Sequence, residues 1–397
     1  MSMKFRIILA CLLTLVLLPS LSLAAGEVAE VGGVKYATFG EAVNAAIAGS
    51  DKTITVIGEV GNYSFSNKNM TGITVQGSET GKITGTLNVT GSTTTFKDAT
   101  FKNLTFEGGN IVFSTATKNF ENFTIDNCVF NDPSNTESKP AIQFQKAAGV
   151  SVDGVKITNN KINNYTGAGI LLNGGGGSGC TVTISGNTIS NVNSNAIQAL
   201  NIENLIISDN TTSNTGSVFN LYGTKNVTFK GNDVTLKSDT QYLAIYLPGL
   251  VEFDSSNTVK YNGSALEPSS SNFYPSADGW DAIRMVAVYA EKDSSGKYTS
   301  GHFAGLESTI SAQLADGLEY TGADYDWDIS ISDPTPTPVV STITPTPAPV
   351  VSAITPTPTE EPSAPVTGDN NNIELLYILM AISLLSILIF AKKCTVH

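Results

Sequence analysis

The stretch Val182-Thr-Ile-Ser-Gly-Asn187 belongs to a set of five similar segments, and their recurrence decides the fold. Each segment alternates apolar and polar residues and then ends in an asparagine. The other four are Phe123-Thr-Ile-Asp-Asn127, Val155-Lys-Ile-Thr-Asn-Asn160, Leu205-Ile-Ile-Ser-Asp-Asn210 and Val227-Thr-Phe-Lys-Gly-Asn232, and a looser sixth ends at Asn257. Successive asparagines are 33, 27, 23, 22 and 25 residues apart. A period of about 20–50 residues is typical of a solenoid.

Each repeat adds a second short apolar stretch to its alternating strand, for example Ala168–Leu172 or Ala196–Leu200. One repeat cannot bury its apolar face alone, whereas stacked coils share a continuous core with strands about 4.8 Å apart. An asparagine at an equivalent turn tolerates the left-handed conformation and can hydrogen-bond to its copies above and below. We therefore predict an asparagine ladder formed by Asn127, Asn160, Asn187, Asn210, Asn232 and Asn257.

This pattern resembles the right-handed parallel β-helix of the pectin-lyase-like superfamily, which has such a ladder. The resemblance covers about 200 residues and concerns architecture, not a catalytic motif. The predicted fold class is an all-β solenoid: a right-handed parallel β-helix with an N-terminal capping helix and a small α+β C-terminal module. A β-sandwich with recurrent turns is the alternative.

The sequence repeat is absent at both ends of the folded part. Thr38 with Glu41 forms a capping box, which predicts a short amphipathic helix over the first coil. We assign residues 26–70 to the N-terminal cap and first coil, 71–276 to the β-helix, and 277–333 to the C-terminal module.

Within the C-terminal module we expect a strand over Ala282–Tyr289 and a helix over Leu306–Leu318. The alternating acids Asp324, Asp326 and Asp328 resemble the start of a calcium loop, but Ile329 stands where that loop needs glycine. We interpret them as the polar face of a strand.

The N-terminal residues 1–25 are typical of a secretory signal, because Lys4 and Arg6 precede the apolar run Ile7–Leu18. The run is short for a membrane span, which is the alternative. At the other end, residues 334–363 form a Pro/Thr-rich segment, for which we predict an extended stalk.

Residues 364–397 combine a short motif, the apolar run Leu375–Ala391 and two lysines. This order resembles the sorting signal of Gram-positive surface proteins, which implies that a sortase cleaves after Thr367. The usual first residue is leucine, and this chain has alanine there. A plain transmembrane anchor is the alternative. The predicted motif residues are Ala364, Pro365, Val366, Thr367 and Gly368.

The composition excludes several functions. The formal net charge is −13, and the only arginines are Arg6 and Arg284. Nucleic acid is therefore not expected as a partner, because its binding depends on neutralising phosphates. The only histidines are His302 and His397, so a mechanism needing several imidazoles is excluded as well.

A polysaccharide enzyme is the serious alternative, because the superfamily that this sequence resembles contains many of them. For a lyase, the resemblance implies a Lys or Arg base together with calcium. A glycosidase needs two carboxylates facing one cleft. The aspartates on or near the coils are Asp126, Asp153, Asp209, Asp233 and Asp254. Those before ladder asparagines are explained as turn formers. We predict no catalytic residue, cofactor or metal site.

A third possibility, ice binding, needs Thr-x-Thr in successive coils. Thr53-Ile-Thr55 and Thr181-Val-Thr183 occur, without repeats between them. We also expect no disulfide between Cys128 and Cys180, which lie about two coils apart.

The sequence thus predicts a β-helix anchored at the cell surface that binds a glycan or another surface ligand without catalysis. A displayed polysaccharide lyase or glycoside hydrolase is the alternative. The expected partners are a sortase, that ligand, and the membrane through the C-terminal segment.

Overall fold

The structure is a computed structural model of the chain. It describes residues 26–113, 119–134, 136, 138–145, 152–174, 179–237, 243–246, 249–266, 273–275, 285–322 and 329–330. The chain divides into two units, Met1–Thr337 and Pro338–His397, and every described residue belongs to the first. The predicted signal peptide, stalk, sorting motif and three-aspartate cluster lie outside the described residues.

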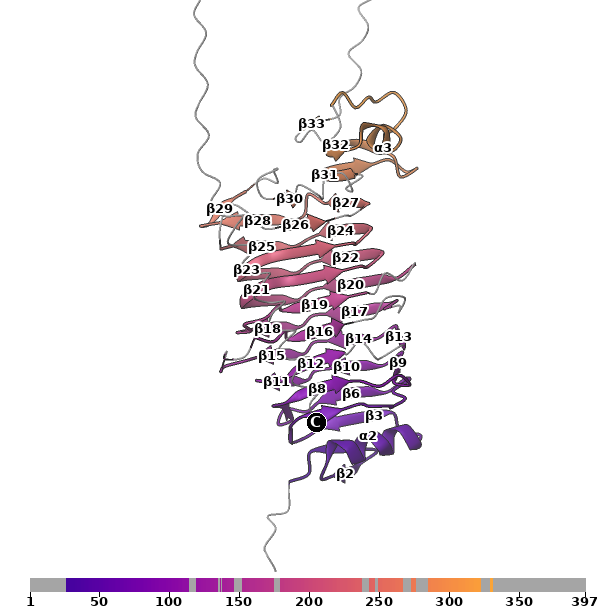
Figure 1. The fold of residues 1–397 in the computed structure, drawn as a ribbon, viewed down its shortest axis with the longest axis vertical. Helices are drawn as coiled ribbons and strands as arrows, with labels where there is room; N and C mark the ends of the chain where they lie inside the picture. Colours follow the sequence, from indigo (N-terminus) through magenta and orange to yellow (C-terminus); the bar gives the residue numbers. More distant parts are fainter. Residues whose placement is uncertain are drawn as a thin grey trace, which may run out of the picture. The chain divides into compact units, whose positions relative to one another are not determined.

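Two long parallel sheets form the solenoid, and their strands lie one above another in chain order (Figure 1). The first sheet, which we call sheet A, is formed by the alternating segment of each repeat. Equivalent residues of successive coils are paired in register along it. Its parallel strands are β3 (Thr53–Val56), β6 (Thr74–Gly77), β10 (Thr100–Lys102), β14 (Thr124–Asp126), β17 (Val155–Thr158), β20 (Thr181–Ser185), β22 (Asn204–Ser208), β24 (Asn226–Lys230) and β27 (Leu250–Phe253).

Sheet B contains two runs of strands, because each coil bends once more before it returns to sheet A. The first run is β4 (Glu59–Val60), β7 (Lys82–Ile83), β11 (Thr105–Glu107), β15 (Val129–Asn131), β18 (Lys161–Asn163), β25 (Asp233–Leu236) and β28 (Thr258–Tyr261). The second run is β5 (Tyr63–Ser64), β8 (Thr86–Val89), β12 (Asn110–Phe113), β16 (Ile142–Gln145), β19 (Ile170–Asn173), β26 (Leu243–Tyr246) and β30 (Phe273–Pro275).

The long strands β21 (Thr188–Leu200) and β23 (Thr211–Tyr222) cross both runs. Smaller pairings are the parallel pair β9 (Thr95–Lys97) and β13 (Asn119–Glu121), and the short antiparallel partner of β28, β29 (Ser264–Ala265). The parallel register from coil to coil excludes the β-sandwich and confirms the predicted parallel β-helix.

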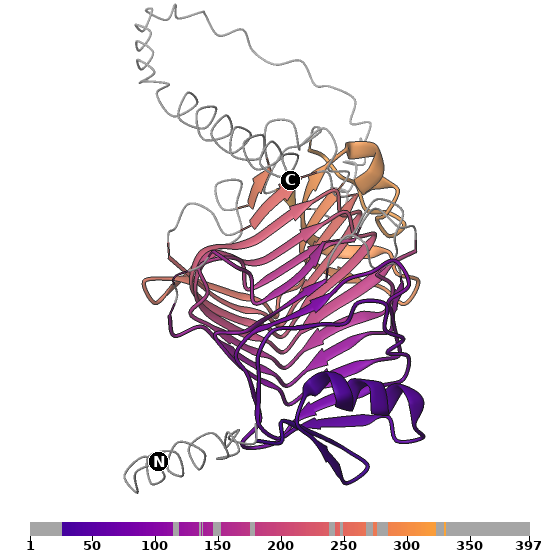
Figure 2. The same ribbon diagram turned by 60° about the horizontal axis from the view of Figure 1, so that its bottom comes forward.

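Both ends of sheet A are covered by antiparallel pairing. At the N-terminal end, β2 (Val34–Tyr36) and β1 (Ala29–Val31) pair in front of β3. The predicted helix is α2 (Phe39–Ala48), with Thr38 and Glu41 bonded as a capping box. Figure 2 shows α2 lying across the indigo end of the coils, where it buries its apolar face.

At the C-terminal end, β31 (Met285–Lys292) pairs parallel with β27 and then antiparallel with β32 (Tyr298–Gly305), which pairs with β33 (Ile329–Ser330). The helix here, α3, covers only Glu307–Ser311 and is shorter than predicted. It ends early because Leu314 forms a β-bridge with Tyr298 and Gly317 has φ +87°.

Stacked aromatic rings fill the core between the sheets. Phe106 lies parallel to Phe130 on the next coil at 4.3 Å between ring centroids, and Phe113 lies over Phe144 at 4.1 Å. The inward positions repeat from coil to coil, so each large side chain packs on its equivalent. This continuous burial is what a single repeat lacks. Cys128 and Cys180 are free and buried within the same interior.

The residue type before the ladder positions is explained by the conformation of the turn from sheet A into sheet B. In successive coils this residue has positive φ at Asn103, Asn127, Asn159, Gly186, Asp209 and Gly231. A Cβ on Gly186 would lie 2.5 Å from Oδ1 of Asn159, and one on Gly231 would lie 2.3 Å from Oδ1 of Asp209. Glycine is favoured at these two positions because it adopts positive φ without strain and leaves room for the side chain of the preceding coil.

Candidate functional site

An inner ladder of asparagines joins consecutive coils. Asn187, which is fully buried, shows the pattern. Its Oδ1 accepts from the backbone N–H and the Nδ2 of Asn160, both at 2.9 Å. Its Nδ2 donates to Oδ1 of Asn210 and to the carbonyl of Ile157. Equivalent side-chain bonds continue the ladder through Asn232 and Asn257. All of these amides are satisfied inside the protein, so the ladder is structural.

Asn127 does not belong to this inner ladder, and Cys128 stands in its place. The N–H of Cys128 donates to Oδ1 of Asn160, as a ladder residue does. Asn127 has φ 49° and bonds through Nδ2 to Asn103 on the outside. The sequence prediction was wrong by one position, because Asn127 is itself the left-handed turn residue, equivalent to Gly186.

The aspartates named from the sequence do not converge on one cleft. They accept hydrogen bonds at separate places: Asp126 from Thr158 and Asn159, Asp153 from the N–H of Thr181, Asp233 from Thr258 and Lys260, and Asp254 from Ser256, while Asp209 occupies a left-handed turn. In the part of the chain that the structure describes, no group of three or more His, Cys, Asp or Glu residues could hold a metal ion.

The outer face of sheet A carries one column of threonines without the second column that Thr-x-Thr needs. Thr53, Thr74, Thr100 and Thr124 are aligned by register. The position two residues later changes from Thr55 to glutamine, lysine and aspartate in the next three coils. Repeated Thr-x-Thr is therefore absent from these coils.

The outer face of the second run of sheet B is uncharged, and we call it the amide face. Its positions are aligned by the ladder pairings from β8 to β23. They are Asn88, Val112, Gln143, Leu171, Gln198 and Asn220 in one column, and Gln145, Asn173, Leu200 and Tyr222 in the next. The other outer faces, in contrast, carry lysines and acids, for example Lys102 and Glu107.

Amide groups on this face are open to a ligand. Within the described part of the chain, the side chains of Gln143, Gln198 and Asn220 make no hydrogen bond, and they are only half-buried. Leu171 lies between Gln143 and Gln198 in the column, and Tyr222 at the end of the second column is 47% exposed. The arrangement offers neutral donors and acceptors beside aliphatic and aromatic surface.

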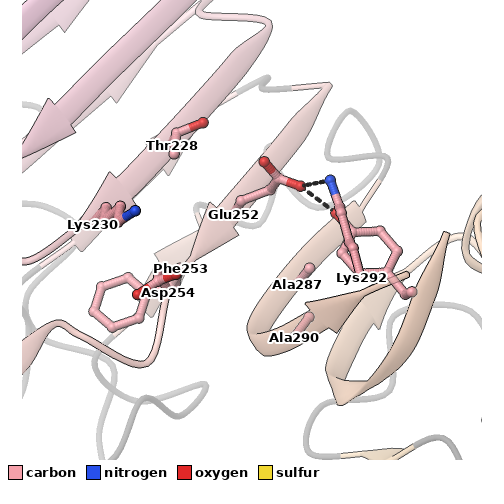
Figure 3. A pocket seen from close by; sticks show the side chains of 9 residues that line it. Thr228, Lys230, Glu252, Phe253, Asp254, Ala287, Ala290 and Lys292 are labelled. Atoms are coloured by element: carbon pink, nitrogen blue, oxygen red, sulfur yellow. Dashed lines mark hydrogen bonds and ion pairs between the residues drawn. The ribbon is translucent and has the colours of Figure 1, made fainter. Parts of the chain in front are cut away.

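A cavity of about 220 Å³ lies on sheet A, where the hairpin β31–β32 rises over β24 and β27. We call it the hairpin pocket. Figure 3 shows Glu252 facing Lys292, with Lys230 and Asp254 beside them and Thr228 above. Glu252 lies on β27 and Asp254 directly follows its last residue, Phe253, and both side chains line the pocket.

The two carboxylates of the hairpin pocket are already engaged. Oε1 of Glu252 accepts from Lys292 and from the hydroxyl of Tyr298. The hydrogen bond from Ser256 lowers the pKa of Asp254. Asp254 was named from the sequence as a candidate, whereas Glu252 was missed. The alternation in Val251-Glu-Phe-Asp254 was the signal that marks both as outward neighbours.

No helix among the described residues is long and apolar enough to cross a membrane. Residues 1–25 and 364–397 lie outside that part of the chain.

The comparison with family models agrees with the stacked coils. The family model described as "Right handed beta helix region" matches residues 85–235 and 147–265. No curated protein matches the chain. One similar solved structure is the catalytic unit of a GH87 α-1,3-glucanase from Streptomyces thermodiastaticus, at 16% identity and TM-score 0.30, covering 64% of this chain and 68% of that one.

A second similar structure is the Dettilon tailspike protein, at 11% identity and TM-score 0.32. The alignment covers 76% of this chain and 86% of the tailspike. The family-model match and the coil-by-coil register together establish the architecture: this chain folds as a right-handed parallel β-helix.

Proposed function

We propose that this protein is a cell-surface β-helix that binds a neutral glycan along its amide face without catalysis. The observation that carries this proposal is the uncharged face itself. In a chain with a formal net charge of −13, it alternates open amides with aliphatic side chains. Sugars combine hydroxyls, which pair with amides, with apolar C–H surface, which packs on aliphatic and aromatic groups.

The spacing along the solenoid also suits an extended glycan. Gln143 and Gln198 are two coils apart, with Leu171 between them. Two coils correspond to about 9.6 Å, since adjacent strands lie about 4.8 Å apart. This distance is close to the disaccharide repeat of an extended β-linked sugar chain, so successive disaccharides would meet equivalent amides.

A glycan array probed with the purified full chain tests this proposal. We expect neutral polysaccharides to bind and anionic ones to be excluded by the acidic protein. The double variant Gln143→Ala/Gln198→Ala should weaken binding to the best neutral glycan at least 10-fold, since two amide contacts are lost. The matched control is Gln76→Ala on sheet A. An equal loss of affinity in the control variant, or a preference for acidic glycans, would contradict glycan binding on the amide face.

Surface display is part of the same proposal and is supported by the sequence pattern at both ends. Residues 1–25 would direct export, residues 334–363 would hold the domain away from the surface, and residues 364–397 would be the sorting signal. Sortase cleavage after Thr367 predicts that Thr367→Ala remains in the membrane fraction of the cells. If wild-type protein is fully extracted by detergent with Cys394 still present, the chain is held by a transmembrane anchor instead.

A carbohydrate-active enzyme is the second candidate, and the pair in the hairpin pocket favours it. Glu252 on β27 and Asp254, which follows the last residue of that strand, both line this pocket, and two residues of extended chain span roughly 7 Å. Glycoside hydrolysis uses two carboxyl groups at such separations, but one must have a raised pKa to act as the acid. Here the pKa of Asp254 is lowered. Release of reducing ends from any glycan, abolished by Asp254→Asn, would favour the enzyme.

A further inference from the structure

The hairpin pocket is built by a change in side-chain size at the end of sheet A. The outward column of the sheet runs through Thr228 and Glu252 and then reaches Ala287. With Ala290 nearby, these small residues leave the floor of the cavity open. The walls are Lys292 and Tyr298 from the two strands of the hairpin, as Figure 3 shows for the side of Lys292.

An unusual backbone conformation directs the hairpin over the sheet. Tyr289 has φ +53°, which is rare for a bulky residue, and the pairing of β31 with β32 shifts register between Val288 and Glu291. Gly301 on the facing strand has φ +137°, and a Cβ there would lie 2.6 Å from Ala290. Strained backbone of this kind gathers at binding sites. The bulge carries Lys292 above Glu252.

The charged groups of the pocket are balanced before any ligand arrives. Lys292 bonds to Glu252 and lies 4.6 Å above the ring of Tyr298, whose hydroxyl donates to the same carboxylate oxygen. The hydrogen bond from Ser256 and the nearby charge of Lys230 lower the pKa of Asp254. The two lysines and the two carboxylates of the pocket therefore balance one another, so a charged ligand gains no net electrostatic attraction here, and one that binds Glu252 or Lys292 must break their ion pair.

Several hydrogen-bonding positions remain open within the described part of the chain. The Nζ of Lys230 and the hydroxyl of Thr228 make no hydrogen bond, and the bonds to Glu252 and Asp254 use only one oxygen of each carboxylate. A ligand with several hydroxyl groups can donate to the free carboxylate oxygens and accept from Lys230 and Thr228. The methyl groups of the floor can pack against its C–H surface.

We propose that the hairpin pocket is a second ligand site, which binds a single neutral sugar ring. The cavity of about 220 Å³ accommodates one ring but not an extended chain. The site lies on sheet A, whereas the amide face lies on sheet B, so the two can be occupied and tested separately. It thus adds a site that recognises one sugar unit to the face proposed for an extended glycan.

Saturation-transfer NMR with the purified full chain tests this site. The probes are glucose, galactose, mannose and N-acetylglucosamine, with glucuronate and glucosamine as charged counterparts. At least one neutral sugar should bind saturably, and the charged ones at least 10-fold more weakly. Lys230→Met, which removes the open donor, and Ala290→Leu, which fills the cavity, should each reduce affinity at least 10-fold.

Two control variants distinguish the hairpin pocket from general surface charge and from the amide face. Lys156→Met removes an exposed lysine from the same face outside the pocket and should leave affinity unchanged. The variant Gln143→Ala/Gln198→Ala should also leave it unchanged, although it weakens glycan binding on the amide face. Absence of saturable binding by all four neutral sugars overturns the proposal. Preference for a charged sugar, or equal loss in either control, overturns it as well.

Discussion

The inner ladder makes a quantitative prediction at Asn187, the buried asparagine in the middle of the solenoid. Replacement by alanine removes the acceptor of the Asn160 N–H, bonded at 2.9 Å, and the donor to the Ile157 carbonyl at 2.8 Å. Two neighbours keep a partner: the Asn160 amide still donates to Ile125, and Oδ1 of Asn210 still accepts the backbone N–H of residue 187. The Asn160 N–H is thus left unpaired, whereas the Ile157 carbonyl keeps its place in the pairing of β17 with β20.

An unpaired buried group costs about 1–3 kcal/mol, so Asn187→Ala should lower the free energy of unfolding by about 1–3 kcal/mol. For a domain of this size, the melting temperature should fall by roughly 2–10 °C. Asn187→Asp should be worse, because it replaces the donor by a second acceptor and buries a charge. Circular dichroism melts and urea titration of the full-length variants measure both changes.

The matched control is Asn226→Ala. Asn226 is exposed on β24 and bonds through Nδ2 to Asn204 at 2.8 Å on the surface. Its loss should cost less than about 0.5 kcal/mol. If Asn187→Ala has the same melting temperature as the wild type, or if Asn226→Ala is destabilised equally, the buried ladder does not stabilise the coils as argued.

Four further predictions concern the turns, the cysteine and the acids. Gly186→Ala should lower the melting temperature by several degrees, because of its positive φ and the 2.5 Å approach to Asn159; a silent variant would refute the covered turn. Cys128→Asn should raise thermal stability by adding a ladder rung, and a lower melting temperature would refute the equivalence. Burial raises the pKa of the Cys128 thiol to about 12, so iodoacetamide should label it at pH 8 only after unfolding. The lowered pKa of Asp254 means that its stabilising contribution is complete above about pH 4 and is lost as pH falls through the folded-state value; acid titration should therefore show a smaller loss of stability in Asp254→Asn.

The repeat signal was strong enough to predict the fold because it reflects a local requirement. Every coil needs an alternating strand with two apolar residues inward and then a residue that tolerates a left-handed turn. Both requirements are met within about six residues, as in Val182–Asn187, so they are visible without knowledge of the neighbours. The N-terminal helix was predictable for the same reason, since its capping box spans Thr38 to Glu41.

The candidate sites were not predictable in this way, because they depend on alignment between coils. The second strand of each coil has no fixed sequence motif, and loops of varying length precede it. Only the pairing Gln143–Leu171–Gln198 shows that uncharged residues about 27 residues apart share one face. The wrong assignment of Asn127 has a different origin. Its turn is as long as that of the next coil, but asparagine occupies the left-handed position there and cysteine occupies the ladder position, and only the register with Asn159 and Asn160 shows this.

The sequence by itself therefore determined the parallel solenoid, its N-terminal cap and the spacing of its buried asparagines. The tertiary structure decided which outward residues meet. Glu252 is 40 residues from Lys292 and 46 from Tyr298, yet one carboxylate oxygen binds both. Local pattern cannot specify such contacts, because the bulge at Tyr289 and the pairing of β27 with β31 bring these residues together only after the coils have stacked.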